Sequence, residues 1–256
     1  MEVFRARDSV SCFWLKFADV ALFQVETEAK AIAWRAYEGT DERGVHHLLA
    51  NQVIPRALAH DGHCLLHAGL VRRSDQAILV MGESGRGKST LSASLRSAGW
   101  TLLGDDGVMI ASLDGSPTAR VTSPSLRLLP DSRAILFPQI DRPRAVAAHT
   151  RKEMLPDVAV ADTQPHPLSA IFVLEPPGRA GSISLRKLSP MDASVAILAN
   201  SMALDATDPG HAQVRVEQAC ALAERVRVHA LDYPRRFDIL GEVHAAMHEA
   251  LAQGGE

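Results

Sequence analysis

The chain has 256 residues, of which 46% are hydrophobic and 22% are charged, and its formal net charge is −3. These values are close to the average for globular proteins, so the chain can bury a sizeable core and disorder is excluded as its main state. The acidic balance argues against a nucleic-acid-binding protein, which normally carries a basic excess. No apolar run is long enough to cross a bilayer, and the first eight residues lack the apolar stretch of a signal peptide. We therefore expect a cytoplasmic protein that binds neither nucleic acid nor membranes.

The beginning of the chain predicts a small module, residues 1–44, ahead of a larger domain, residues 45–256. Residues 13–23 are rich in strand-forming side chains. Residues 27–37 fit a short strand or a short helix equally well. The three cysteines are far apart and no Cys-x-x-Cys occurs, so we expect buried, unreactive thiols rather than a zinc site or disulfides.

The larger domain is predicted to begin with a helix followed by two strands. Residues 39–44 are typical of a turn. Residues 45–59 have apolar side chains at helical spacing, with Pro55 as a point where the helix can kink. Residues 64–71 and 77–81 then predict a strand pair joined by a hairpin turn.

Further along, helical and strand patterns alternate, which is typical of an α/β fold. A helix is predicted over residues 88–98, with Gly99 as its C-terminal stop. A short strand at 101–103 is predicted to end at the Gly-Asp-Asp-Gly sequence of residues 104–107, and another strand to follow at 108–113. The remaining predicted elements are strands at 120–129, 168–174, 182–188 and 226–231, and helices at 191–202, 211–224 and 239–252.

Residues 82–89, Gly-Glu-Ser-Gly-Arg-Gly-Lys-Ser, fit the pattern G-x-x-x-x-G-K-[ST] of a phosphate-binding P-loop, the Walker A motif. Glycines allow the backbone to turn so that successive N–H groups face one anion. Lys88 is predicted to neutralise the β- and γ-phosphates, and Ser89 to offer its hydroxyl to Mg²⁺. The alternative, a chance glycine turn, is disfavoured by the apolar strand before the motif and the periodic helix after it. The residues predicted to contact the nucleotide are Gly82, Glu83, Ser84, Gly85, Arg86, Gly87, Lys88, Ser89 and Thr90.

Asp105 and Asp106 follow the strand at 101–103, and the carboxyl ends of strands in a parallel α/β sheet line the ligand crevice. One carboxylate there can hold Mg²⁺, directly or through water, and the other can accept the proton of an incoming hydroxyl. Two adjacent carboxylates repel a phosphate unless a cation is present, so the pair predicts a metal. The alternative is a solvated turn without a role, and the position just after the P-loop unit favours the functional interpretation.

His67 lies in the strand pair that precedes the P-loop. It can contact the γ-phosphate or the nucleophile, although a lone histidine in a strand is often structural.

Taken together, these residues resemble the catalytic domain of the HPr kinase/phosphorylase family and its related serine kinases, including those of lasso-peptide gene clusters. The resemblance rests on Leu-His-Ala-Gly around His67, on the P-loop ending Gly-Lys-Ser-Thr, and on the aspartate pair. His67 precedes Lys88 by 21 positions and Asp106 follows it by 18. The resemblance covers about residues 45–240 and is specific near 62–110.

The resemblance implies an α/β domain with a P-loop of the HPr kinase and phosphoenolpyruvate carboxykinase type, using ATP or another nucleoside triphosphate with Mg²⁺. It implies that Asp106 is the general base toward a serine hydroxyl, Asp105 its metal- or water-linked neighbour, and His67 a contact of the transferred phosphate, with Lys88 as the fourth catalytic residue. Ser89 and Asp105 would hold the metal.

In this family a later mobile loop adds a basic residue, for which Arg151 or Lys152 is the candidate; the alternative is that both are solvated loop charges. The implied acceptor is a serine of a peptide or small protein, such as an HPr-like protein or a ribosomally made lasso precursor peptide, and family members often form homo-oligomers. The bifunctional members carry a further acidic metal-binding residue in a strand with a Glu-Ile-Arg-Gly-like signature. The comparable stretch here, residues 123–131, lacks that signature and offers Asp131 as the candidate, so the resemblance leaves the reverse phosphorylase activity open.

Two other functions fit the same motif. A small-metabolite kinase would have a closed substrate pocket beside Asp106, whereas an open groove would favour a peptide. A nucleotide-hydrolysing switch would have no acceptor, and usually carries a guanine-reading Asn-Lys-x-Asp element, which this sequence lacks.

Overall fold

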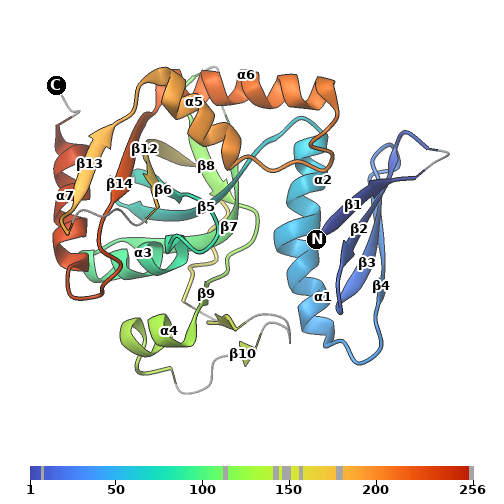
Figure 1. The fold of residues 1–256 in the computed structure, drawn as a ribbon, viewed down its shortest axis with the longest axis horizontal. Helices are drawn as coiled ribbons and strands as arrows, with labels where there is room; N and C mark the ends of the chain where they lie inside the picture. The colour runs from blue at the N-terminus through green and yellow to red at the C-terminus, as the bar shows by residue number, and fades with distance from the viewer. Residues whose placement is uncertain are drawn as a thin grey trace.

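The computed structural model describes residues 1–6, 9–111, 115–140, 151–155, 158–176 and 181–253, and the backbone of residues 144–145. Within these residues the chain is a mixed α/β protein with a large central sheet and a smaller N-terminal sheet (Figure 1). This confirms the α/β class predicted from the alternating pattern. In the described part of the chain, no helix is both long and apolar enough to cross a membrane.

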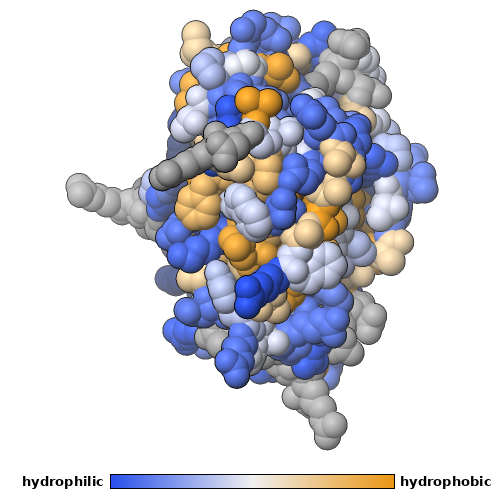
Figure 2. Space-filling view, turned by 90° about the vertical axis from the view of Figure 1, so that its right-hand side faces the viewer, coloured by the Kyte–Doolittle hydropathy of each residue, from blue (hydrophilic) through white to orange (hydrophobic). Residues whose placement is uncertain are grey.

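The N-terminal sheet is an antiparallel meander whose inner face is apolar. Its strands, in chain order and in spatial order, are β1 (Glu2–Arg5), β2 (Cys12–Phe17), β3 (Ala21–Glu26) and β4 (Ala31–Ala36). Phe13, Leu15 and Phe23 point inward and are fully buried, because alternate strand residues share a face. Figure 2 shows the outward side, where hydrophobic and hydrophilic residues are interleaved. Of the segment at 27–37, residues 27–30 form a turn and residues 31–36 form strand β4, so the strand alternative holds over its second half and there is no helix.

The inner face of this sheet packs on a long, irregular helix. It consists of α1 (Glu42–Leu48), a π-helical turn η1 (Leu49–Val53) and α2 (Ile54–His60). Pro55 has no N–H to donate to the carbonyl four residues earlier, and the π-turn ends at Val53, two residues before it. The helix begins at Glu42 with Asp41 as its cap, so the predicted turn at 39–44 is too long. Val45, Leu48 and Val53 join the apolar core of the N-terminal sheet, and the domain boundary at residue 44 stays a prediction.

The central sheet has seven strands in the order β13-β14-β12-β6-β5-β7-β8. Their bounds are β5 (Cys64–Arg73), β6 (Gln76–Met81), β7 (Thr101–Ala111), β8 (Thr118–Val121), β12 (His166–Leu174), β13 (Ser184–Lys187) and β14 (Arg227–Asp232). Strands β6, β12 and β14 are parallel, whereas β5, β7, β8 and β13 pair antiparallel with their neighbours. Strand β8 also pairs with the start of β12, so the sheet curls back on itself.

Helices cover both faces of the central sheet. One face packs on α3 (Lys88–Ser94), its 3₁₀ extension η2 (Leu95–Ala98) and α7 (Leu240–Ala252), and the other on α5 (Pro190–Ala199) and α6 (Pro209–Arg225) (Figure 1). A peripheral layer consists of α4 (Pro130–Leu136) and the three-stranded sheet β10-β11-β9, with β9 (Arg127–Leu128), β10 (Arg144–Ala145) and β11 (Glu153–Met154). Cys12 and Cys64 are buried as predicted, but Cys220 on α6 is exposed.

Two strand predictions are wrong in a way that matters for function. The segments at 101–103 and 108–113 are not separated by a Gly-Asp-Asp-Gly turn, because one strand, β7, runs through residues 101–111. Asp105 and Asp106 therefore lie in the interior of a strand paired antiparallel with β5, not at the carboxyl end of a parallel strand. The predicted strand at 120–129 is also interrupted: β8 ends at Val121 and the two-residue β9 begins at Arg127.

The register across three strands nevertheless brings the aspartate pair level with the start of the P-loop. Gly69 of β5 is opposite Val80 of β6 on one side and opposite Asp105 of β7 on the other. Strand β6 ends at Met81, one residue after Val80. The pairing of strands across the sheet thus brings the carboxylates level with the end of β6; their position along the chain does not.

Gly69 also sets the approach of helix α3 to the sheet. A Cβ atom there would lie 2.2 Å from Ser92 Oγ and 3.0 Å from Ser92 Cβ. We expect Gly69→Ala to destabilise the protein by about 1–3 kcal/mol, because a buried site is overpacked. Gly115→Ala is the control, since no atom lies within 4 Å of its Cβ position. Urea unfolding measures both, and equal stability of the two variants would contradict the close approach.

Candidate functional site

The P-loop between β6 and α3 has the backbone shape that its glycines permit. Gly82, Gly85 and Gly87 have φ angles of +138°, +83° and +95°, which residues with side chains rarely adopt. A Cβ atom on Gly82 would also lie 2.8 Å from the carbonyl oxygen of Leu174 at the end of β12. The loop conformation therefore depends on glycine at its first position for two separate reasons.

Lys88 begins helix α3 and is buried, with 6% of its surface exposed. Its Nζ donates hydrogen bonds to the carbonyl oxygens of Gly82 (2.7 Å) and Glu83 (3.1 Å), so the ammonium is held inside the loop. Burial lowers the pKa of Lys88, and the carboxylates of Asp105 and Asp106 act in the opposite direction. The side chain is thus placed to offer a positive charge to an anion bound by the loop.

Asp105 is buried beneath this loop, with 3% of its surface exposed. Burial, and then the charge of Asp106, raise the pKa of Asp105 to about 6, while a hydrogen bond from Ser89 acts in the opposite direction. Its Oδ2 atom has no hydrogen-bond partner among the residues described. A buried carboxylate oxygen without a donor is unfavourable unless a cation satisfies it.

Asp106 is also 3% exposed, and it has a φ of +103°, which is unusual for a residue other than glycine. Arg127 Nη2 donates to Asp106 Oδ2 in a buried ion pair. Burial acts to raise the pKa of Asp106, but the charge of Arg127 and the neighbouring His67 outweigh it, so this pKa lies below its usual value. Asp106 is therefore an ionised carboxylate beside the P-loop.

His67 on β5 lies against Asp106. Its Nδ1 is 3.1 Å from the Asp106 carbonyl oxygen and 3.8 Å from Asp106 Oδ1. Burial, and then the charge of Lys88, lower the pKa of His67 to about 4, so the ring is neutral near pH 7. Because a carbonyl oxygen only accepts, Nδ1 carries the proton and Nε2 keeps its lone pair.

Two residues that the sequence did not single out complete this cluster. Arg127 was only part of a strand prediction, and no pattern in the sequence linked it to Asp106, 21 residues earlier. Asn200, the last residue of the turn closing α5, accepts a hydrogen bond from the Gly82 N–H with its side chain (3.1 Å) and from the His67 N–H with its carbonyl (2.8 Å). It ties the P-loop to the histidine strand. The predicted helix at 191–202 placed Asn200 inside a helix, whereas α5 ends at Ala199, so no sequence signal marked this residue.

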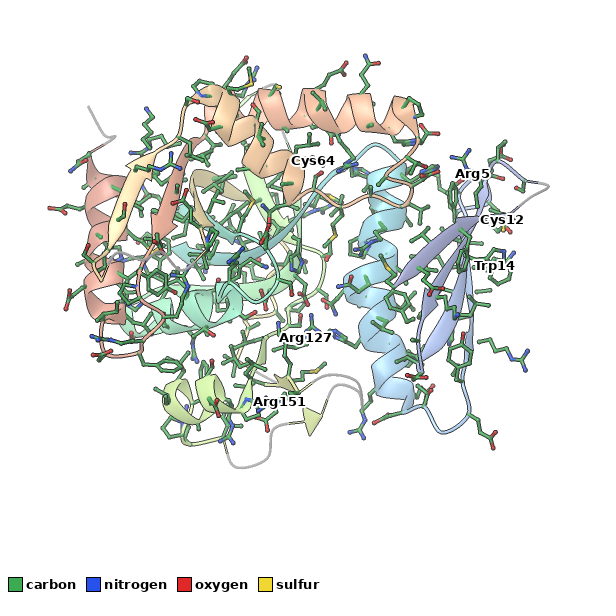
Figure 3. All side chains as sticks on the ribbon, in the orientation of Figure 1. Arg5, Cys12, Trp14, Cys64, Arg127 and Arg151 are labelled. Carbon is green, nitrogen blue, oxygen red and sulfur yellow. The ribbon has the colours of Figure 1, made fainter. Side chains whose placement is uncertain are left out.

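The other predicted residues are divided between the site and its surroundings. Lys152 faces the site and acts electrostatically on both aspartates and on Lys88. Arg151 is exposed, lies near α4 in Figure 3 and lines neither pocket at the P-loop. Asp131 is exposed in the first turn of α4. Within the loop, Glu83 and Arg86 pair with each other at 2.6 Å.

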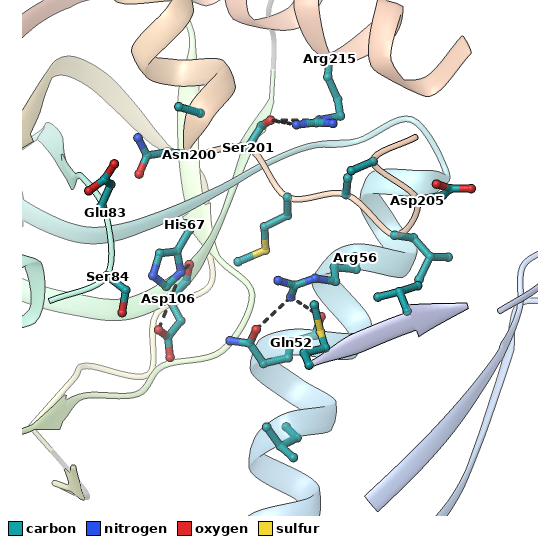
Figure 4. Close-up of a pocket in the computed structure, with 18 of the residues that line it drawn as sticks. Gln52, Arg56, His67, Glu83, Ser84, Asp106, Asn200, Ser201, Asp205 and Arg215 are labelled. Atoms are coloured by element: carbon teal, nitrogen blue, oxygen red, sulfur yellow. Dashed lines mark hydrogen bonds and ion pairs between the residues drawn. The ribbon is translucent and has the colours of Figure 1, made fainter. Parts of the chain in front are cut away.

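Two pockets share Asp106 in their lining. A narrow pocket of about 90 Å³ is formed by the P-loop, His67, Asp106, Arg127 and Lys152. A cleft of about 1030 Å³ extends from the same residues to the N-terminal sheet (Figure 4). Its walls come from β1 and β2, from the helix α1–α2, and from the segment between α5 and α6. The narrow pocket suits phosphates, and the cleft has room for a second, larger ligand.

The donor set fits a magnesium ion shared with a nucleotide. Among the described residues no group of three or more His, Cys, Asp or Glu side chains is arranged to hold a metal by itself. Mg²⁺, however, is commonly bound by one or two protein oxygens together with substrate phosphates. The unpartnered Oδ2 of Asp105 and the hydroxyl of Ser89, which contacts this carboxylate, are oxygen ligands of the required kind.

No model of a known protein family and no curated protein matches the chain. Among solved structures, the chain is similar to the HPr(Ser) kinase/phosphatase from Coxiella burnetii, with 13% sequence identity and a TM-score of 0.39. The match covers 75% of this chain and 99% of that one. At this TM-score the likeness supports no functional conclusion, and the geometry of the site has to carry one.

The backbone of Asp106 predicts an unusual response to substitution. We expect Asp106→Gly to be more stable than Asp106→Ala by about 1 kcal/mol, because both remove the carboxylate but only glycine relieves the positive φ. Chemical denaturation of the two variants measures this difference directly. An alanine variant as stable as the glycine variant would show that the backbone is not strained.

The raised pKa of Asp105 predicts a pH-dependent effect on stability. An unfolded aspartate ionises near pH 4 and the folded one near pH 6. The protonated form therefore stabilises the fold below about pH 4, and this contribution is lost as the pH rises through 6. In EDTA, we expect Asp105→Asn to raise the free energy of unfolding by about 2 kcal/mol at pH 7.5 and to change it little at pH 4.5. Thermal melts at both pH values test this, and a shift of equal size at both would contradict it.

Proposed function

We propose that the protein is an ATP-dependent phosphotransferase that moves the γ-phosphoryl group to a serine hydroxyl of a peptide or small protein. The observation that carries this proposal is the alignment of the P-loop with an ionised, buried carboxylate, Asp106, across three strands of the central sheet. A nucleotide-binding loop alone fits many functions. A carboxylate placed between that loop and a large cleft is the arrangement that hydroxyl phosphorylation requires.

In this proposal the P-loop and Lys88 bind the β- and γ-phosphates in the narrow pocket. Ser89 and Asp105 would hold Mg²⁺, which neutralises phosphate charge when bound. Asp106 would orient the acceptor hydroxyl and accept its proton. The transition state of phosphoryl transfer is loose, so the proton is taken late and the low pKa of Asp106 is no obstacle. With its proton on Nδ1, neutral His67 has only a hydrogen-bond acceptor at Nε2, so it would contact the acceptor hydroxyl, which can donate, rather than a phosphate oxygen.

The extent of the cleft, rather than its volume, favours a peptide over a small metabolite. Pockets for small molecules typically have volumes of about 300–1,000 Å³ and enclose most of the ligand. The volume of the cleft beside Asp106, about 1030 Å³, is close to this range, but the cleft continues from the P-loop past the helix α1–α2 to the N-terminal sheet, as an extended acceptor would need. We infer that the N-terminal sheet and the helix α1–α2 form the acceptor side of the protein.

Transfer of labelled phosphate from Mg²⁺-ATP to serine peptides tests this function. We expect label on serine with the wild-type protein, and a decrease of about 10²–10⁴-fold in rate for Asp106→Asn, because the proton acceptor is lost. Phosphoamino-acid analysis of the labelled peptide identifies the acceptor residue.

The matched control is Asp131→Asn, which removes an exposed carboxylate on α4. We expect this variant to transfer phosphate at the wild-type rate. ATP turnover that labels no peptide and is unaffected by Asp106→Asn would refute the proposal and favour a nucleotide-hydrolysing switch.

A further inference from the structure

The charges that line the large cleft are not balanced. Its acidic side chains are paired locally: Asp106 with Arg127, Glu83 with Arg86, and Asp205 with Arg5 at 2.7 Å. Arg56 and Arg215 also line the cleft. Neither forms an ion pair with any carboxylate among the described residues. The cleft therefore presents two guanidinium groups whose charge is not neutralised by the protein.

Arg56 projects from α2 into the space in front of Asp106 (Figure 4). It is partly buried, and one nitrogen, Nη1, donates to the main-chain and side-chain oxygens of Gln52 at 2.8 and 2.9 Å. These two neutral acceptors hold the side chain in place but leave its charge uncompensated. Arg56 also interacts electrostatically with Asp106, so a group bound by Arg56 would lie within range of the proposed base.

Arg215 reaches the cleft from α6, on the opposite wall. Its Nε and Nη2 both donate to the hydroxyl of Ser201, at 3.0 and 2.8 Å. The guanidinium is thus fixed in orientation by a neutral partner. Arginine is the side chain best suited to bidentate binding of carboxylate or phosphate groups. An arginine that is already fixed and partly desolvated loses little conformational entropy when it binds such a group.

We propose that Arg56 and Arg215 form an anion-binding wall in the acceptor cleft, and that the acceptor is a peptide whose serine is flanked by acidic residues. This inference rests on the proposed kinase function for the identity of the serine, but the anion-binding wall itself does not depend on catalysis. The serine would lie at Asp106 and the flanking carboxylates at the two arginines. The acidic side chains that line the cleft are paired with arginines, so they would not repel such a peptide as unpaired carboxylates would.

Peptide binding without nucleotide provides the first test. Two pentapeptides carry an uncharged fluorophore and one central serine, flanked on each side by two glutamates in one and by two glutamines in the other. We expect fluorescence anisotropy to show at least about tenfold tighter binding of the glutamate peptide, weakening with added salt. Arg56→Gln and Arg215→Gln should each reduce this affinity about tenfold and leave the weak binding of the glutamine peptide unchanged.

Arg225→Gln is the control for net charge, because it removes a positive charge from the same helix as Arg215 but outside the cleft. It should leave the affinity for the glutamate peptide unchanged. Arg56→Lys, which keeps the charge, should restore part of the affinity. Equal binding of the two peptides, or an equal effect of Arg225→Gln and Arg215→Gln, would overturn the proposal.

Phosphate transfer to the same two peptides separates the anion-binding wall from the kinase function. If the arginines select the glutamate peptide in binding but neither peptide is labelled, the wall stands and the kinase proposal fails. If both peptides are labelled equally, and the arginine variants reduce turnover without changing peptide affinity, the kinase proposal stands. In that case Arg56 acts only on Asp106, and the anion-binding wall is refuted.

Discussion

The burial of two adjacent carboxylates in the middle of a strand is the constraint on which the rest of the site depends. Asp105 and Asp106 cannot both remain ionised in a sheet interior unless positive charge surrounds them. The protein supplies Arg127 to Asp106 and leaves one oxygen of Asp105 without a donor. Lys88 interacts electrostatically with both aspartates, and so does Lys152. The same charges that make the pair tolerable suit the proposed binding of phosphates and a cation.

The antiparallel pairing of β5 with both β6 and β7 brings these parts together. Because β5 is shared, a residue in its middle is level both with the strand that leads into the P-loop and with the aspartate pair. Three glycines permit the close packing: Gly69 admits α3, Gly82 admits the end of β12, and Gly107 admits Thr122. Small residues at these points allow the charged side chains to converge without opening the core.

The N-terminal sheet contributes more than an added layer. It packs on the helix α1–α2, and Arg5 on β1 forms ion pairs with Asp205 and Asp208 in the segment before α6. These contacts hold one wall of the cleft against the other. Under the proposed function, the N-terminal sheet and the helix α1–α2 would contact the acceptor, and the P-loop would bind the phosphates. Asp106 lies between these two parts of the chain.

The sequence by itself determined the glycine-rich loop at residues 82–89 and the strand and helix around it, because glycine spacing and local periodicity are encoded over short stretches. It also predicted His67, Asp105 and Asp106 as site residues, from their spacing around this loop and the family resemblance. It was misleading at the Gly-Asp-Asp-Gly sequence, where turn-forming residues lie inside a strand. Tertiary structure decided the register that places the aspartates, and the partners Arg127, Asn200, Arg56 and Arg215, which come from distant segments. Pairing across a sheet and the neutralisation of buried charge depend on contacts between residues far apart in the chain, and no local pattern records them.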